Sequence, residues 1–337
     1  MIPFQRPVNR QTQMYTSGRK LIFDKIPYSG KITRMWVRFF GSVTITHNTT
    51  TGTPIGDLLA NLAQNIRVLR LPDAGLGQYR VDCSGQGLVR LAQQIDKFLM
   101  IDRNGVGNGT FTYGAGAAGT YAIDVWIPII FGRATALDVY QPAQGGTCTS
   151  FKVEVSCASI GQLFSGTDST WNADNTIQVQ ILDTREDSST PEVPLYIEDH
   201  YAQILAAKTD YRDDRLPTTG TFVNILAMTR TQGVLQTLAD GVINWVTFTG
   251  PSIDMTEADA MTIKANNRPL ESTQSLAGIH NFDFHGKFGH VGVDAGSLTQ
   301  KWNVLNPSGS GNDFLHIVTK RTPLSEAQLS AMRNGRS

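Results

Sequence analysis

The sequence predicts an all-β protein made of two similar domains in tandem. The first observation that supports this prediction is a weak internal repeat, which we call the echo. Residues 26–40 and residues 216–230 share one pattern, although they lie more than half the chain apart. Each copy has an apolar residue, a proline, two small or polar residues, a glycine and then an extended apolar run. The shared turn residues are Pro27 and Gly30 in the first copy and Pro217 and Gly220 in the second. The second support is a series of short runs in which apolar and polar residues alternate, as in half-buried strands.

Composition agrees with two globular domains and with no catalytic specialisation. The chain has 337 residues, of which 40% are hydrophobic and 17% charged, too apolar for a disordered protein. Basic and acidic residues balance at 29 each, so no net charge draws the chain to nucleic acid or to an anionic membrane. Three cysteines, Cys83, Cys148 and Cys157, form neither a disulfide framework nor a zinc pattern. We expect neither a secretory signal nor a membrane span, because no apolar stretch is long enough.

The first 20 residues form a polar arm whose charges are all basic. Arg6, Arg10, Arg19 and Lys20 precede the first acidic residue, Asp24. The arm has no helical periodicity. It is therefore either a frayed terminus or an arm that lies against neighbouring subunits, anionic lipid headgroups or nucleic acid.

Strands and two helices are expected in the first domain. Residues 32–40 alternate as a strand, whereas residues 53–69 change to helical spacing after a threonine cap and a first-turn proline. A second helix is expected over 87–99, and a glycine-rich loop over 104–119. Two further strands follow at 120–131 and 150–157. Their inward side chains are expected to fill the first core: Met35, Val37, Phe39, Ile123, Val125, Ile127, Phe151, Val153 and Val155.

The second half of the chain has the same kind of short, alternating strands, which follow a turn-rich stretch at 161–175. Further strands are expected at 176–183, 200–208, 221–229, 242–249, 260–264 and 313–320. Ser325 and Gln328 make a capping box for a short C-terminal helix. The expected organisation is an arm at 1–20, a first domain at 21–160, a linker at 161–175, a second domain at 176–322 and a tail at 323–337. An eight-stranded jelly roll takes roughly 150 residues, so two fit.

Two motifs suggest ligand binding, but the predicted secondary structure around them does not suit that function. Residues 114–119 match the dinucleotide pattern GxGxxG, but a strand follows them where phosphate binding needs a helix. His280, His285 and His290 are spaced five apart, which suits neither a strand face nor a helix face for a metal. Neither motif supports an enzyme, and no cofactor or metal is expected.

An acidic and basic cluster precedes the second copy of the echo. It comprises Asp210, Arg212, Asp213, Asp214 and Arg215. One interpretation is a solvated turn, and the other is a salt-bridge network at a subunit contact.

Taken together, the two β-domains with their repeated Pro-x-x-Gly turns resemble the double jelly-roll major capsid proteins. These build the shells of tailless icosahedral viruses of the adenovirus-like lineage, many of them bacteriophages with an internal membrane. The helix expected near 54–66 is similar to helices that this family carries beside its sandwiches. The short length of the chain points to a small phage.

The resemblance implies a structural role in a virion capsid, with the protein made in the host cytoplasm. The chain would form pseudo-hexagonal homotrimers, contact neighbouring trimers, penton and minor capsid proteins, and lie over an internal lipid membrane where one exists. It implies no sequence-specific nucleic acid partner. Arg6, Arg10, Arg19 and Lys20 would face the interior, toward lipid or genome. Pro27, Gly30, Pro217 and Gly220 would set the turns at which strands begin.

Two other functions stay open from the sequence. A phage spike or baseplate protein that binds host glycan would need exposed aromatic residues, for which the candidates are Trp171, Trp245 and Trp302. A glycoside hydrolase would need two carboxylates facing each other, and Asp124 is the candidate for one of them.

Overall fold

The computed structural model divides the chain into two compact units, Met1–Glu192 and Val193–Ser337. The described residues, to which all statements below refer, are 7–27, 31–47, 53–54, 58–71, 79–95, 101–102, 105–106, 119–129, 150–165, 169–186, 195–231, 237–251, 253–259, 261–263, 277–284, 292–309, 311–325, 327–329 and 331.

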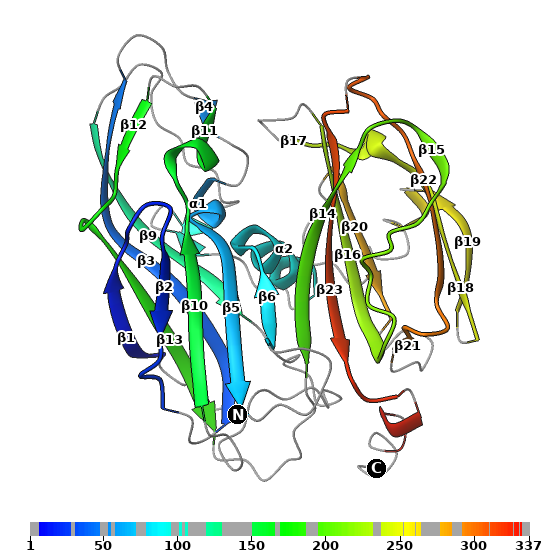
Figure 1. The fold of residues 1–337 in the computed structure, drawn as a ribbon, viewed down its shortest axis with the longest axis horizontal. Helices are drawn as coiled ribbons and strands as arrows, with labels where there is room; N and C mark the ends of the chain where they lie inside the picture. The colour runs from blue at the N-terminus through cyan, green and yellow to red at the C-terminus, as the bar shows by residue number, and fades with distance from the viewer. Residues whose placement is uncertain are drawn as a thin grey trace. The chain divides into compact units, whose positions relative to one another are not determined.

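Unit 1 is a sandwich of two antiparallel sheets (Figure 1). One sheet has the order β1-β13-β3-β9, with β12 also on β3 and with β7 and β8 beyond β9. The other has the order β2-β10-β5-β6. The eight main strands are β1 (Val8–Met14), β2 (Lys20–Phe23), β3 (Lys31–His47), β5 (Ala63–Leu71), β6 (Val81–Cys83), β9 (Gly119–Ile129), β10 (Ser150–Cys157) and β13 (Ile177–Glu186). The minor ones are β4 (Thr53–Pro54), β7 (Ile101–Asp102), β8 (Gly105–Val106), β11 (Phe164–Ser165) and β12 (Ser169–Asn172).

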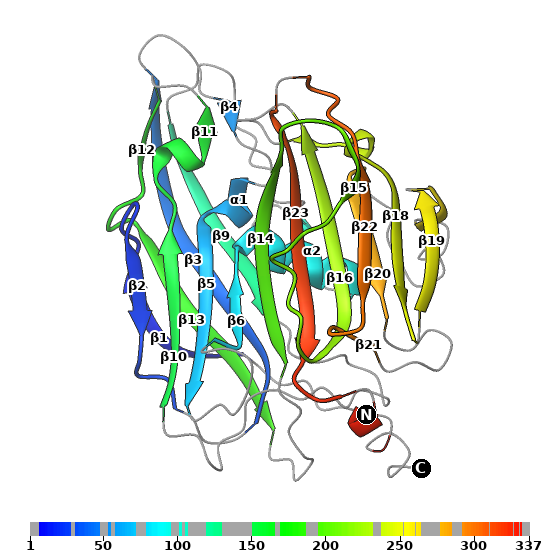
Figure 2. The same cartoon turned by 45° about the vertical axis from the view of Figure 1, so that its right-hand side comes forward.

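Unit 2 is also a sandwich of two antiparallel sheets (Figure 2). One has the order β14-β23-β16-β20, with β17 and β21 also on β16, and the other has the order β15-β22-β18-β19. The main strands are β14 (Tyr196–Ile204), β15 (Lys208–Tyr211), β16 (Thr221–Thr231), β18 (Ile243–Gly250), β19 (Ile253–Asp259), β20 (Ile279–Asp283), β22 (Thr299–Val304) and β23 (Asp313–Thr322). The minor strands are β17 (Thr237–Leu238) and β21 (Val293–Asp294).

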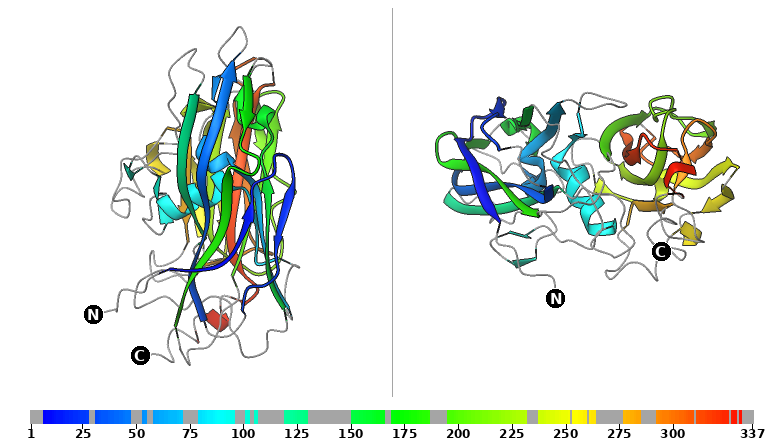
Figure 3. Two further views of the ribbon diagram at one scale, coloured as in Figure 1. Left: turned by 90° about the vertical axis from the view of Figure 1, so that its left-hand side faces the viewer. Right: turned by 90° about the horizontal axis from the view of Figure 1, so that it is seen from below.

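The two units have one topology. When the eight main strands of each unit are numbered in chain order, one sheet reads 1-8-3-6 and the other 2-7-4-5, in both units. This is the strand order of a jelly roll, and a view along the strands separates the two layers of each unit (Figure 3). The predicted all-β fold of two tandem jelly rolls is therefore confirmed.

The echo in the sequence falls at the same place in both units. The third main strand, β3 or β16, begins at Lys31 or Thr221, directly after the glycine of each Pro-x-x-Gly turn. Gly220 has φ of 83°, a left-handed backbone that glycine adopts at little cost. Its carbonyl accepts a hydrogen bond from the Ala295 amide at 2.8 Å. Gly30 lies outside the described residues.

The cores form as strand alternation predicts. All nine residues expected in the first core are at most 3% exposed. In unit 2 the Phe248 ring makes edge contacts with Phe282 and Trp302, at 4.9 and 5.3 Å between centroids. Burial of such rings is the main favourable term in folding.

Helices are few and short. They include α1 (Leu58–Asn61), α2 (Gly85–Ile95) and the 3-10 turns η1 (Ile160–Gln162) and η3 (Asp240–Val242). The helix predicted over 87–99 corresponds to α2. The C-terminal capping box is confirmed, since the Ser325 amide donates to Gln328 Oε1 at 2.9 Å and the Gln328 amide donates to Ser325 Oγ at 3.3 Å.

The helix expected over 53–69 is wrong for most of its length. Only α1 is helical, and β5 then pairs with β10 and β6. The final part of this segment also alternates, since Ile66 and Val68 are buried and Arg67 is half-buried. The segment therefore has both helical spacing and strand alternation, and its pairing with distant strands makes it a strand. The strand expected at 260–264 is likewise replaced by a helical turn at Met261–Ile263.

The domain boundary lies at Glu192/Val193 and not at the expected linker, 161–175. Within that stretch β12 pairs with β3, and β13, which follows it, lies between β1 and β3. The segment 176–183 therefore supplies the eighth strand of unit 1 and not the first strand of unit 2. Residues Val8–Met14 of the arm expected at 1–20 form β1, which belongs to the same sheet.

Candidate functional site

An aromatic and charged cluster lies on β3 and β9, on the face of the sheet away from the core. Arg38 donates to both oxygens of Asp124 at 2.7 Å, and the Trp126 indole donates to the same carboxylate at 3.0 Å. The Arg38 guanidinium also lies 4.4 Å from the Phe40 ring centre and 4.8 Å from that of Trp126. Phe40 is 43% exposed. Arginine and aromatic side chains of this kind commonly dominate protein interfaces.

Asp124 is thus held by an arginine and an indole. Both its oxygens accept hydrogen bonds from Arg38, and no second carboxylate is seen to face it among the described contacts, as a glycoside hydrolase would need. The arrangement favours a binding surface over a catalytic one.

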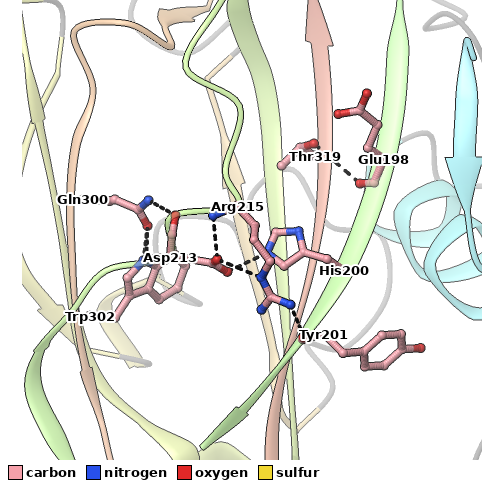
Figure 4. Close-up of polar contacts among 8 residues, drawn as sticks. All are labelled: Glu198, His200, Tyr201, Asp213, Arg215, Gln300, Trp302 and Thr319. Carbon is pink, nitrogen blue, oxygen red and sulfur yellow. Dashed lines mark hydrogen bonds and ion pairs between the residues drawn. The ribbon is translucent and has the colours of Figure 1, made fainter. Parts of the chain in front are cut away.

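A second cluster in unit 2 ties the loop after β15 to β14 (Figure 4). Asp213 Oδ2 lies 2.5 Å from His200 Nε2, and Asp213 Oδ1 accepts from the Arg215 amide at 3.1 Å. Arg215 Nη1 donates to the Tyr201 carbonyl at 2.5 Å. Gln300 donates to the Asp213 carbonyl at 2.7 Å and accepts from the Trp302 indole at 2.6 Å.

The electrostatics of Asp213 follow from these contacts. Burial by itself would raise the pKa of this carboxyl, but the His200 contact and the Arg215 charge outweigh it, so that the pKa lies below its usual value. Asp213 is therefore charged in the fold. The acidic and basic cluster seen in the sequence acts, for Asp213 and Arg215, as an ion-pair network within the chain.

The same loop and β14 border an open cavity of about 370 Å³. Its lining residues are Tyr201, Ala202, Gln203, Tyr211, Arg212, Asp213, Asp214 and Arg215. These include no serine, threonine or cysteine, so the His200–Asp213 pair has no such nucleophile in the cavity. The network ties the loop that leads to β16 to β14.

A third cluster joins β14 to β23. His316 is fully buried, its Nε2 lies 2.7 Å from Asp199 Oδ2, and its ring stacks on Tyr201 at 3.9 Å between centroids. Burial lowers the pKa of His316 below its ordinary value, although Asp199 opposes that shift.

The four basic residues expected to act together differ in environment. Arg10 donates to Asp183 at 2.6 Å and Lys20 donates to Glu154 at 3.1 Å, and both carboxylates are buried. Arg19 is exposed, and Arg6 lies outside the described residues. That these residues face the interior of a shell stays a prediction.

The predicted turn residues and motifs also have definite places. Pro27 accepts a hydrogen bond from Arg185 at 2.6 Å through its carbonyl, and Pro217 is half-buried before Gly220. His280 is buried in β20, whereas His285, His290, Cys148 and most of the 114–119 segment lie outside the described residues. Cys83 and Cys157 are buried thiols that are not part of a disulfide.

The described part of the chain can be compared with the side-chain groups that hold metal ions and with the helices that cross membranes. No group of three or more His, Cys, Asp or Glu side chains there is arranged to hold a metal ion. None of the described helices has the length and apolar character that a membrane crossing requires.

Comparison with known proteins identifies the fold by structure alone. No family model and no curated sequence matches the chain. Among solved structures, the major capsid protein of Sulfolobus Turreted Icosahedral Virus superposes with a TM-score of 0.69 at 13% identity, over 96% of this chain and 98% of that one. Capsid protein P2 of bacteriophage PM2 gives 0.54 at 12% identity, over 95% and 97% of the two chains. The PBCV-1 virus capsid protein gives 0.56 at 10% identity, over 94% and 92%.

These neighbours are viral capsid proteins, a structural and non-enzymatic class. The likeness extends over nearly the full length of each chain, so it includes both units. The chain has the double jelly-roll fold of these viral major capsid proteins.

Proposed function

We propose that this chain is a major capsid protein that forms homotrimers and assembles an icosahedral shell. The observation that carries the proposal is the duplicated topology, because one chain then supplies two similar lobes. Three such chains around a threefold axis present a six-lobed outline. A six-lobed outline tiles a curved shell with nearly equivalent contacts.

The likeness to capsid proteins supports this proposal at the level of fold. It is strengthened by the coverage, since at least 95% of each chain takes part in the likeness. Pentons, minor capsid proteins and an underlying membrane are the further partners that we infer for such a shell.

The test is the solution mass of the purified protein by light scattering after size exclusion. We expect a stable species near three times the chain mass of 36.8 kDa, with six-lobed particles in electron micrographs. A clean monomer at all concentrations tested would overturn the proposal.

A glycan-binding spike protein is the alternative. One of the tryptophans that suggested it, Trp302, is wrong as an exposed candidate, because it is 0% exposed and belongs to the core. Trp245 is half-buried beneath Lys301, and the Trp171 side chain lies outside the described residues. The aromatic cluster around Phe40 would have to take their place, and a glycan array tests it directly.

A further inference from the structure

One edge of unit 1 is basic and partly apolar. β1 and β2 lie at the edges of their two sheets and contact each other, since Gln13 donates to the Ile22 carbonyl and the Lys25 amide donates to Gln11 at 2.9 Å. Residues 7–27 carry four cations and one anion, Asp24. Arg10 and Lys20 are paired with the buried carboxylates of Asp183 and Glu154, so the cations that this edge presents outside those pairs are Arg19 and Lys25, both exposed. The same edge exposes Val8, Met14 and Ile22, at 47%, 38% and 43%.

One edge of unit 2 has the opposite charge. β19 is the last strand of its sheet, and it carries Asp254, Glu257 and Asp259, all exposed, with no cation. The neighbouring strand β18 has no charged residue. Met261, which follows β19, is 74% exposed, the most exposed of the large apolar side chains described. The chain has zero net charge, so this separation onto two edges is not a consequence of composition.

Glu257 occupies a backbone position that disfavours it. Its φ is 47°, in the left-handed region where glycine is the usual residue, and the pairing of β19 with β18 shifts register there. A bulge of this kind turns a side chain away from the sheet. Strained non-glycine residues tend to persist where the side chain has a use, and here the side chain is an exposed carboxylate.

We propose that the β19 edge of one subunit binds the β1–β2 edge of a second copy of this chain. The inference rests on the proposed function and identifies the surfaces that carry its trimer contact. The three exposed anions of β19 complement Arg19 and Lys25 on the other edge, and both edges expose apolar side chains that burial would stabilise. Because the two surfaces differ, the contact is head-to-tail. Repeated contacts of that kind close into a ring of three when each subunit is related to the next by a rotation of a third of a turn.

The acidic edge of unit 2 favours a second copy of the chain as the binding partner over anionic lipid or nucleic acid. Either of those would bind Arg19 and Lys25, but neither accounts for the acidic edge of unit 2. A second copy uses both surfaces at once.

Charge reversal tests the contact. We choose Asp254→Lys with Glu257→Lys for the acidic edge, and Arg19→Glu with Lys25→Glu for the basic edge, because these residues are exposed and make none of the buried ion pairs of Arg10 and Lys20. Each reversed pair is expected to raise the trimer dissociation constant roughly a hundredfold or more. The chain with all four changes is expected to recover the trimer, since the charges are then exchanged.

The control is Asp210→Lys with Asp214→Lys, the same charge change at exposed residues elsewhere in unit 2. It should leave the trimer intact. A trimer that survives either reversed pair, a control that dissociates equally, or no recovery in the fourfold variant would overturn the contact. A wild-type monomer would instead overturn the proposed function itself and the contact with it.

A second variant guards against misfolding. Glu257→Gly suits the left-handed backbone, so the protein should resist urea at least as well as the wild type, while the dissociation constant rises about tenfold. Unchanged association would contradict the proposal. Binding to phosphatidylserine vesicles that is lost in the Arg19→Glu, Lys25→Glu protein, with the trimer intact, would assign the basic edge to a membrane and also overturn it.

Discussion

At the scale of single residues, the charges near the N-terminus divide into structural and exposed ones. Asp183 is fully buried and accepts from Arg10 at 2.6 Å and from Arg185 at 2.7 Å, so β1 is fastened to β13 by charge as well as by backbone pairing. Removing one partner leaves a buried carboxylate with less compensation, which is costly. Arg19, nine residues later, is exposed.

We expect Arg10→Ala to lower the free energy of unfolding by about 1–3 kcal/mol. Arg19→Ala should change it by less than about 0.5 kcal/mol. Urea denaturation of the two variants measures both values. Equal effects would show that the Arg10–Asp183 pair does not stabilise the fold.

His316 makes unit 2 sensitive to acid. Its pKa in the folded protein is lowered, chiefly by burial, so the folded state resists a proton that the unfolded chain accepts at an ordinary value of about 6.5. Its contribution to stability is therefore present above that pH and is lost as the pH falls toward the folded pKa. The groups that face it are Asp199, His200 and Arg230.

We accordingly expect wild-type stability to fall from about pH 7.5 to about pH 5.5 more steeply than that of His316→Asn, which has no imidazole to protonate. Urea denaturation at the two pH values gives the slopes. Parallel slopes would place the acid sensitivity on other groups.

At the scale of elements, β3 depends on one glycine in its middle. Gly41 has φ of 150°, and a Cβ there would lie 2.1 Å from the Thr176 carbonyl oxygen, at the turn that leads into β13. The close approach lets one long strand pair with both β9 and β13. The chain can pass this point only without a side chain.

Gly41→Ala should therefore destabilise the protein by at least about 3 kcal/mol, because backbone must move or the strand must break. Gly161→Ala is the matched control, since a Cβ at Gly161 meets nothing within 4 Å. Thermal unfolding compares the two. A tolerated Gly41→Ala would show that β3 and the 173–177 turn can separate.

At the scale of the whole molecule, the two jelly rolls share one topology but differ in the charges on their edge strands. Repetition gives the chain two similar sandwiches, but their edges differ in charge: Arg19 and Lys25 are exposed at the β1–β2 edge, whereas β19 exposes three carboxylates. Exposed ion pairs weaken when salt screens them.

If subunits associate through these edges, raising NaCl from about 0.05 M to about 0.5 M should shift the trimer toward monomer. Light scattering across the series measures the shift. The chain with Asp254→Lys and Glu257→Lys should show no such weakening, because its edges repel. Association that salt does not change would indicate a contact carried by apolar burial alone.

The sequence by itself determined the features that depend on neighbouring residues. Alternation at 32–40, 120–131 and 150–157 identified β3, β9 and β10, and the echo at Pro27 and Pro217 identified the duplication. The capping box at Ser325 was equally visible. The acidic cluster at 210–215 is also visible in the sequence, but its partner His200 lies on β14, 13 residues from Asp213, and no local pattern connects the two.

Only the tertiary structure decided which strands pair and therefore where each unit ends. β13 belongs to unit 1 because it fits between β1 and β3, although its sequence would suit a strand of either unit. β5 is a strand because β10 and β6 take up its backbone hydrogen bonds, which outweighs its mixed periodicity. The burial of Asp183 and Trp302 follows from the same long-range pairing. Neighbouring residues set the apolar periodicity of a segment. The strands with which it pairs lie far along the chain, and they decide its position in the sheet.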